Sequence, residues 1–522
     1  MTDILVKFNS SRFILEPRTQ ELNTELTKFF KKGKIDVSNI KDFSLLFKNI
    51  NSVGYFSIIL HIVLTGKILY NTQKDITDQR KIISGYLDIL EKFCSHSVYG
   101  SLEHLNLFIS NNLCYYYSYH NESNLQLFKK INKLMIQLCP TLGESKIQRQ
   151  IVLQSDVIKV GFVSDIIMSL HSVTKDRLGI IKGLYNDPRF EVKIITRLKE
   201  TDIFFNNFVF NGVNYNSLIY KLNGDLDQNK KQIYDQQFDI LVYPEIGMCQ
   251  KSRWLAFCRL APIQITTWGH SDTSGLPEID YYVSSKYFNV PDDQQYFSEK
   301  LVLLNSIGTY YYNLTKILDL SDISQIKDQM LKFSQKNNIL DPHYYGCLQT
   351  YFKLHPDFID ILNQITKKDE NAVFVVLIND NHKEVMDFLN KNMLDSSKVM
   401  MIETLKYPEY CKLIKACDVI LDYYPFGGFN SSMDSFSLGK IVITLPSKFI
   451  NGCFTRGLYN KMEITQFICD NPQDYVNKAT QIMLNTDERC TFEKLILEKS
   501  EILFEDKESI NEWASFLHHL NN

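Results

Sequence analysis

The spacing of apolar residues changes near residue 157, and this change limits the folds that the chain can adopt. From there on, short runs rich in β-branched residues alternate with segments of helical pattern. Such alternation is typical of βαβ units, which build a parallel sheet with helices on its faces. The runs are VIKVGFVSD from 157, VKIIT from 192, DILVYPE from 239, IQITTW from 263 and YYVSS from 281.

A second series of the same kind begins after about residue 330. We expect the polar segment from Lys316 to Lys336 to carry the connection between the two series. Two successive doubly wound domains enclose a cleft, and ligands bind in such sheets beyond the carboxyl ends of the strands. The expected strands are AVFVVLI from 372, KVMMIE from 398, DVILD from 418 and IVITLP from 441.

Residues 1–150 have a helical pattern instead. Apolar side chains recur there at intervals of three and four, until Pro140 ends the pattern. They are Ile83, Tyr86, Leu87, Leu90 and Phe93, and then Leu127, Ile131, Leu134, Met135 and Leu138. We therefore predict three parts: an all-α domain at 1–150, a first Rossmann-like domain at 151–325, and a second one with C-terminal helices at 326–522.

Net charge, apolar stretches and cysteine spacing argue against several classes of protein. The net charge of −3 over 522 residues gives no basic field for nucleic acid. The start of the chain has no apolar signal segment, and the longest apolar stretch, Tyr55 to Leu64, is shorter than the roughly 20 residues of a membrane span. The eleven cysteines form no CxxC pair and no zinc-like cluster. We expect a cytoplasmic protein without a membrane span and with reduced cysteines.

The segment CDVILDYYPFGGFNSSMD is the most informative motif. An apolar strand runs into Gly427 and Gly428, which allow close backbone approach. Asn430, Ser431 and Ser432 then resemble the start of a helix, where free N–H groups and hydroxyls suit a phosphate. Asp434 follows, placed to accept ribose hydroxyls. An ordinary capped helix would show the same pattern.

A second motif, CLQTYFKLHPDF, places Gln349 and Lys353 four residues apart, on one face if the segment is helical. A lysine facing the cleft can neutralise a pyrophosphate leaving group. The alternative is a lysine in solvent. His355 precedes Pro356, so we expect an extended backbone there and a weaker candidate.

Two histidines follow predicted strands. His270 lies in the glycine-flanked loop TTWGHSDTSG, and His171 lies six residues after Asp165. Histidine can accept a proton near neutral pH, which makes both of them candidate bases. A structural, hydrogen-bonded role is the alternative for each.

Taken together, these segments resemble the O-GlcNAc transferase family, and above all its bacterial members and the cytoplasmic N-glycosyltransferases that modify adhesins. The likeness covers about residues 116–460. It rests on seven phrases in family order: YYSYHNESNLQLFKKINKLMIQLCP, VGFVSD…HSV, DILVYPEIGM, LAPIQITTWGHSDTSGLPEIDYYVSS, YFSEKLVLL, CLQTYFKLHPDF and DVILDYYPFGGFNSSMD.

The resemblance implies a GT-B fold, inversion at the sugar carbon, no cofactor and no metal, with a UDP-sugar as co-substrate and a protein acceptor. It implies that Lys353 binds the diphosphate, that Gln349 helps to hold the nucleotide, that Asn430 and Ser431 contact phosphate, and that Asp434 holds the ribose. From the residue pattern we add Gly428 and Ser432 to this candidate nucleotide-sugar site. His171 matches a histidine beside the sugar–diphosphate, and His270 matches the GH of the N-glycosyltransferase loop.

The sequence also departs from the family. Phe429, Asn430 and Ser431 replace the common His-Thr-Thr, and Cys453 stands where many relatives have arginine. Two alternatives therefore stay open: a transferase acting on a glycan or small molecule, and an inactive protein that only binds nucleotide sugar. The sugar, the acceptor atom and the oligomeric state are not fixed by the sequence.

Overall fold

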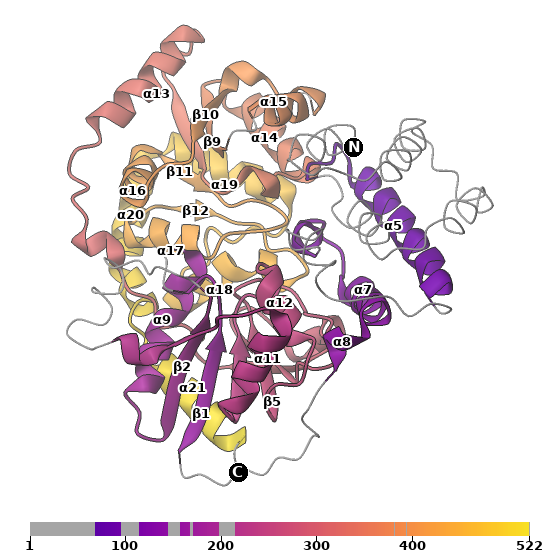
Figure 1. Cartoon of the computed structure of the whole chain (residues 1–522). Helices are drawn as coiled ribbons and strands as arrows, with labels where there is room; N and C mark the ends of the chain where they lie inside the picture. Colours follow the sequence, from indigo (N-terminus) through magenta and orange to yellow (C-terminus); the bar gives the residue numbers. More distant parts are fainter. Residues whose placement is uncertain are drawn as a thin grey trace.

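The computed structural model describes residues 68–94, 114–144, 157–167, 171–197, 215–379, 382–392 and 394–520. Two parallel sheets form the centres of two stacked units, each covered by helices (Figure 1). This confirms the predicted α/β class with two doubly wound units. Most of the predicted helical region at 1–150, including Tyr55 to Leu64, lies outside the described residues.

The first sheet has seven strands in the order β3-β2-β1-β4-β5-β6-β7. Every neighbouring pair is parallel. The five runs predicted from sequence all form strands, and two further strands, β3 and β7, were not predicted. The strands are β1 (Ile158–Val163), β2 (Phe190–Thr196), β3 (Ile219–Lys221), β4 (Ile240–Tyr243), β5 (Ile263–Thr267), β6 (Tyr281–Ser285) and β7 (Lys300–Leu304).

The second sheet has five parallel strands in the order β10-β9-β8-β11-β12. Four of them match the predicted runs, and the central strand β8 was not predicted. The strands are β8 (His343–Cys347), β9 (Ala372–Ile378), β10 (Val399–Glu403), β11 (Val419–Leu421) and β12 (Val442–Ile443).

Helices cover both sheets. Those before and within the first unit are α5 (Gln73–Cys94), α7 (Leu125–Leu138), α8 (Pro140–Gly143), α9 (Ser172–Tyr185), α11 (Leu226–Asp235) and α12 (Gln250–Ala256). Those of the second unit are α13 (Ser324–Lys336), α14 (Pro356–Lys368), α15 (His382–Lys391), α16 (Tyr407–Ala416), α17 (Asn430–Ser437), α18 (Phe454–Met462), α19 (Pro472–Leu484) and α20 (Thr486–Lys499). The segment predicted as the connection therefore becomes helix over much of its length, as α13.

The described helices before residue 157 pack on the first unit. Phe128, Ile131 and Leu134 of α7 are buried in one cluster with Trp254 and Leu255 of α12. The predicted apolar spacing is thus the buried face of α7. This contact places the short 3₁₀ segment Tyr115–Tyr119 between the two sheet units.

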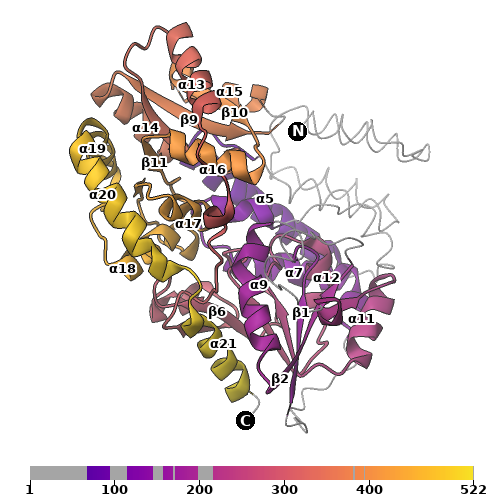
Figure 2. The same cartoon turned by 90° about the vertical axis from the view of Figure 1, so that its left-hand side faces the viewer.

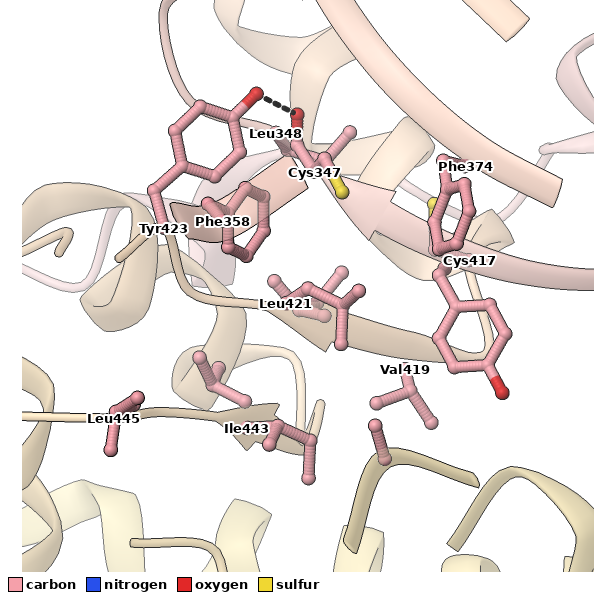
Figure 3. Packing of buried hydrophobic residues seen from close by; sticks show 14 of the residues in the cluster. Cys347, Leu348, Phe358, Phe374, Cys417, Val419, Leu421, Tyr423, Ile443 and Leu445 are labelled. Atoms are coloured by element: carbon pink, nitrogen blue, oxygen red, sulfur yellow. Dashed lines mark hydrogen bonds between the residues drawn. The ribbon is translucent and has the colours of Figure 1, made fainter. Parts of the chain in front are cut away.

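Aliphatic and aromatic side chains fill the space between the second sheet and its helices (Figure 3). Phe358 of α14 packs against Tyr423, with 4.9 Å between the ring centroids. The Tyr423 hydroxyl donates a hydrogen bond to the carbonyl of Cys347 at 3.0 Å. This bond ties the segment after β11 to the end of β8, the two strands from which the site loops begin.

The last helix, α21 (Lys507–Leu520), leaves the second unit and returns to the first (Figure 2). Its Trp513 and Leu517 are buried with Leu178 and Ile181 of α9. The C-terminal segment therefore links the two units physically. No helix among the described residues is both long enough and apolar enough to span a membrane.

Candidate functional site

A cavity of about 470 Å³ lies between the two units, beyond the carboxyl ends of β1, β4, β5, β8 and β11. This is the position expected for a ligand in doubly wound sheets. Its lining includes seven residues predicted from the sequence: His171, His270, Gln349, Lys353, Gly428, Asn430 and Ser431. Ser432 and Asp434 do not line it.

Lys353 supplies a cation to the cavity. It ends the 3₁₀ segment Tyr351–Lys353, and its Nζ donates to Gln349 Oε1 at 2.8 Å and to the Gly427 carbonyl at 3.2 Å. Burial lowers the pKa of Lys353 to about 8, against the opposing effect of nearby Asp422. Its hydrogen-bond partners are neutral, so the positive charge is free to meet an anion.

Asp422 organises this end of the cavity, although the sequence analysis did not single it out. Its Oδ1 accepts from Gln349 Nε2 at 2.8 Å and from the Gly428 amide at 2.7 Å, and Thr444 donates to Oδ2 at 2.8 Å. A Cβ on Gly428 would lie 1.9 Å from Ser431 Oγ, so a larger residue there would displace the Ser431 hydroxyl. The sequence did contain a signal for this role: an acidic residue follows directly after a buried strand and stands shortly before a Gly-Gly pair.

The helix α17 begins at Asn430, as the sequence predicted. The Asn430 side chain spans the two units: its Nδ2 donates to Asp176 Oδ1 at 3.0 Å, and its Oδ1 accepts from the Tyr311 hydroxyl at 2.8 Å. Ser432 points elsewhere, since its hydroxyl lies 2.7 Å from the Thr455 hydroxyl. Asn430 and Ser431 therefore present this helix end to the cavity.

Asp434 is buried and has protein partners. Lys175 Nζ lies 3.0 Å from one of its carboxylate oxygens, and the Tyr407 hydroxyl donates to the other at 2.7 Å. The ribose role inferred from sequence stays a prediction, because it requires the carboxylate to exchange these partners.

The two histidines present different groups to the cavity. His171 caps α9, and its Nδ1 accepts the Val173 amide at 3.2 Å, so the neutral ring carries its proton on Nε2. His270 Nε2 is buried without a hydrogen-bond partner among the described residues. Burial lowers the pKa of His270 to about 3, and a hydrogen bond with the Tyr115 backbone opposes this effect. That bond favours the protonated ring, so Nδ1 is the donor and Nε2 offers a lone pair.

Sequence reasoning missed a third group of lining residues. Tyr115 and Tyr119 come from the segment before α7 and close one side of the cavity. The Tyr115 ring lies 5.2 Å from the His270 ring, and the Tyr119 ring lies 4.6 Å from that of Phe426.

His355 caps α14 with the expected extended backbone, and it does not line the cavity.

The charged run Lys175-Asp176-Arg177 was also missed, because such a run normally marks a solvated helix face. All three side chains are buried. The Arg177 guanidinium lies 3.9 Å from the centroid of Trp268, a lining residue, and its Nη1 donates to the Gly308 carbonyl at 3.0 Å. Asp176 itself lines the cavity.

No family model matches the sequence. A curated relative, the UDP-glucose:protein N-beta-glucosyltransferase of Actinobacillus pleuropneumoniae serotype 5b (strain L20), is 24% identical over 271 residues, 50% of this chain and 41% of that protein. The probable UDP-N-acetylglucosamine–peptide N-acetylglucosaminyltransferase SPINDLY of Eustoma exaltatum subsp. russellianum is 22% identical over 265 residues, 49% of this chain and 28% of that protein. The chain thus matches less than half the length of these relatives.

Among solved structures, a mutant of the O-GlcNAc transferase of Thermobaculum terrenum superposes with a TM-score of 0.60 at 14% identity, covering 83% of this chain and 81% of that one. The chain resembles O-GlcNAc transferase-like glycosyltransferases in sequence and fold. The resemblance read from the motifs is therefore confirmed, and the paired sheets are those of a GT-B glycosyltransferase fold.

Proposed function

We propose that the chain transfers a hexose or N-acetylhexosamine from a UDP-sugar to Ser, Thr or Asn of a protein acceptor. The observation that carries this proposal is Lys353, held by neutral partners beside the Gly427–Gly428 turn and the start of α17. Cation, backbone amides and helix terminus together suit a diphosphate. Relatives named for transfer from UDP-sugars to proteins support the choice of substrates.

The leaving group dictates the mechanism. As the bond between the sugar carbon and the diphosphate breaks, negative charge develops on UDP. Lys353 and the amides at the start of α17 would stabilise that charge, which is the work a metal ion does in other sites. Attack by the acceptor from the opposite face of the sugar would invert the configuration at its carbon. We propose that neither a metal nor another cofactor takes part.

The opposite wall of the cavity suits the sugar and the acceptor. His171 offers an N–H donor, and the His270 ring lines the cavity with its Nε2 buried and without a hydrogen-bond partner among the described residues. Aromatic faces such as those of Tyr115 and Tyr119 offer packing surface for a sugar ring or an acceptor side chain. We propose that both histidines hold hydroxyl groups in this half of the site.

Two measurements test the proposal. A thermal-shift screen with UDP-GlcNAc, UDP-glucose, UDP-galactose and GDP-fucose identifies the donor, because a ligand of the folded state raises the melting temperature. Incubation with the radiolabelled donor and a polypeptide mixture then measures transfer. We expect a shift with a UDP-sugar and label on protein. Donor binding without transfer or hydrolysis would favour an inactive nucleotide-sugar-binding protein, and label on glycans alone would favour the other transferase class.

A further inference from the structure

Asp176 is the one carboxyl group among the described residues that line the cavity. It lies on α9, five residues after His171, and its side chain is 3% exposed. Its location is therefore the wall of the first unit, facing the start of α17 on the second unit.

Hydrogen bonds fix the orientation of this carboxyl group. Tyr311 donates to the Asn430 amide oxygen, which turns the Asn430 NH₂ group toward Asp176 Oδ1. No hydrogen bond to Asp176 Oδ2 is found within the part of the chain that the structure describes. One carboxylate oxygen is thus held, and the other is available to a ligand.

We propose that Asp176 takes the proton of the attacking acceptor group during sugar transfer, an assignment that rests on the proposed function. A hydroxyl or amide of the acceptor protein loses this proton as it attacks, and a base within hydrogen-bond reach lowers the barrier. A carboxylate with one oxygen held and the other available meets this requirement.

The step balances as a single displacement. The acceptor oxygen or nitrogen forms the new bond to the sugar carbon, while the bond from that carbon to the diphosphate oxygen breaks. Its electron pair leaves with UDP, on the side of Lys353. The acceptor proton passes to Asp176 Oδ2, and the carboxylic acid then returns it to solvent.

The two histidines of the cavity are less suited to this step. His171 Nδ1 accepts the Val173 amide, so the neutral ring presents a donor to the cavity. His270 has its lone pair on Nε2, but burial lowers the pKa of His270 to about 3, which makes the ring a poor proton acceptor. Both remain suited to hold hydroxyl groups.

The surroundings of Asp176 agree with a base that works near neutral pH. The pKa of Asp176 is raised to about 7: burial is the main cause and nearby Asp434 adds to it, whereas Arg177, the Asn430 hydrogen bond and Lys175 act in the opposite direction. His171 and His270 line the cavity on the same unit as Asp176, and Lys353 lines it on the second unit. Because the carboxyl must be ionised to accept a proton, kcat/KM should rise with pH through about 7.

The test compares Asp176→Asn with the wild type in transfer, UDP affinity, melting temperature and pH profile. The amide keeps the shape and can still accept the Asn430 hydrogen bond, but it cannot take up the proton. We expect kcat to fall about 10²–10⁴-fold with UDP affinity and melting temperature nearly unchanged. The matched control is Asp239→Asn: Asp239 is a partly buried carboxyl of the same unit, bonded to the Lys159 amide and absent from the cavity lining, and this variant should retain wild-type kcat.

The wild-type pH profile gives a readout that does not depend on the folding of any variant. A kcat/KM that is flat between pH 5.5 and 7.5, or an Asp176→Asn variant with wild-type kcat, would overturn the assignment while leaving the proposed function intact. Absence of both transfer and donor hydrolysis in the wild type would overturn the proposed function, and this assignment with it.

Discussion

Lys175 Nζ lies 3.0 Å from a carboxylate oxygen of Asp434, so an ion pair joins α9 of the first unit to α17 of the second. The side chains are 9% and 5% exposed. The Tyr407 hydroxyl donates to the same carboxylate, and its ring lies 3.9 Å from Lys175 Nζ. The two units are thus tied directly beside Asp176 and Asn430.

We expect Asp434→Asn to lower the melting temperature. Breaking a buried ion pair leaves Lys175 without its counter-charge, which typically costs about 3–5 kcal/mol of unfolding free energy. Thermal unfolding checks this. Asp328→Asn is a suitable control, because it removes an exposed i,i+4 pair with Lys332 that should contribute less than about 1 kcal/mol. An unchanged melting temperature would contradict the role of the pair as a tie.

UDP titration of the same Asp434→Asn protein tests the ribose prediction separately. A ribose contact would require the carboxylate to exchange Lys175 and Tyr407 for the ribose hydroxyls. The variant would then lose UDP affinity as well as stability, since charge-assisted hydrogen bonds contribute about 1.5–3 kcal/mol each. Wild-type affinity would remove Asp434 from the nucleotide site.

Lys353→Ala should lose most turnover while the protein stays folded. The lysine is the cation beside the phosphate turn, and removing a comparable charge-stabilising group costs about 10²–10³ in rate. Turnover with labelled donor and the far-UV spectrum measure the two effects. Lys332→Ala, which removes an exposed lysine of α13, serves as the control. Wild-type turnover in Lys353→Ala would remove the lysine from the diphosphate site.

Long aliphatic runs predicted several strands, and two of the missed strands lack such runs, whereas the missed β7, with the sequence KLVLL, has one. The aliphatic run AVFVVLI predicts β9. By contrast, β8 has the sequence HYYGC, and β3 has only three residues. Pairing with β9 on one edge and β11 on the other, which a single sequence does not display, makes His343–Cys347 the central strand of its sheet.

The candidate site, too, could be predicted from the sequence only in part. Gln349 and Lys353 are close in the chain, so their spacing was enough to place them together. The Lys175–Asp434 and Asp176–Asn430 contacts join residues more than 250 positions apart, and they depend on how the two units pack against each other. The residue pattern within one segment does not show how the two units pack together. A Lys-Asp-Arg run that is buried between them therefore looks, in the sequence, like a run exposed to solvent.

Transfer should survive EDTA. The positive charge of Lys353 and the amides at the start of α17 would stabilise the leaving diphosphate in place of a divalent ion. Among the described residues, no group of three or more His, Cys, Asp or Glu side chains is arranged to hold a metal ion. The measurement is transfer after dialysis against EDTA, with and without added Mn²⁺ or Mg²⁺. Loss of activity that Mn²⁺ restores would overturn the metal-free mechanism.

Glu245 should make the protein less stable as the pH rises. It follows β4, it is fully buried, and its Oε2 has no hydrogen-bond partner among the described residues. Burial raises the pKa of Glu245 from 4.5 to about 8, so the folded protein keeps a proton that the unfolded chain releases. Between these two values the unfolded state binds fewer protons, and the free energy of unfolding falls with pH by up to about 1.4 kcal/mol per unit. Above about pH 8 both states are ionised and this decline ends. Glu245→Gln cannot ionise and should lack the decline. Urea unfolding of both proteins from pH 5 to 9 measures the difference, and parallel stability curves would show that Glu245 is ionised in the folded protein throughout.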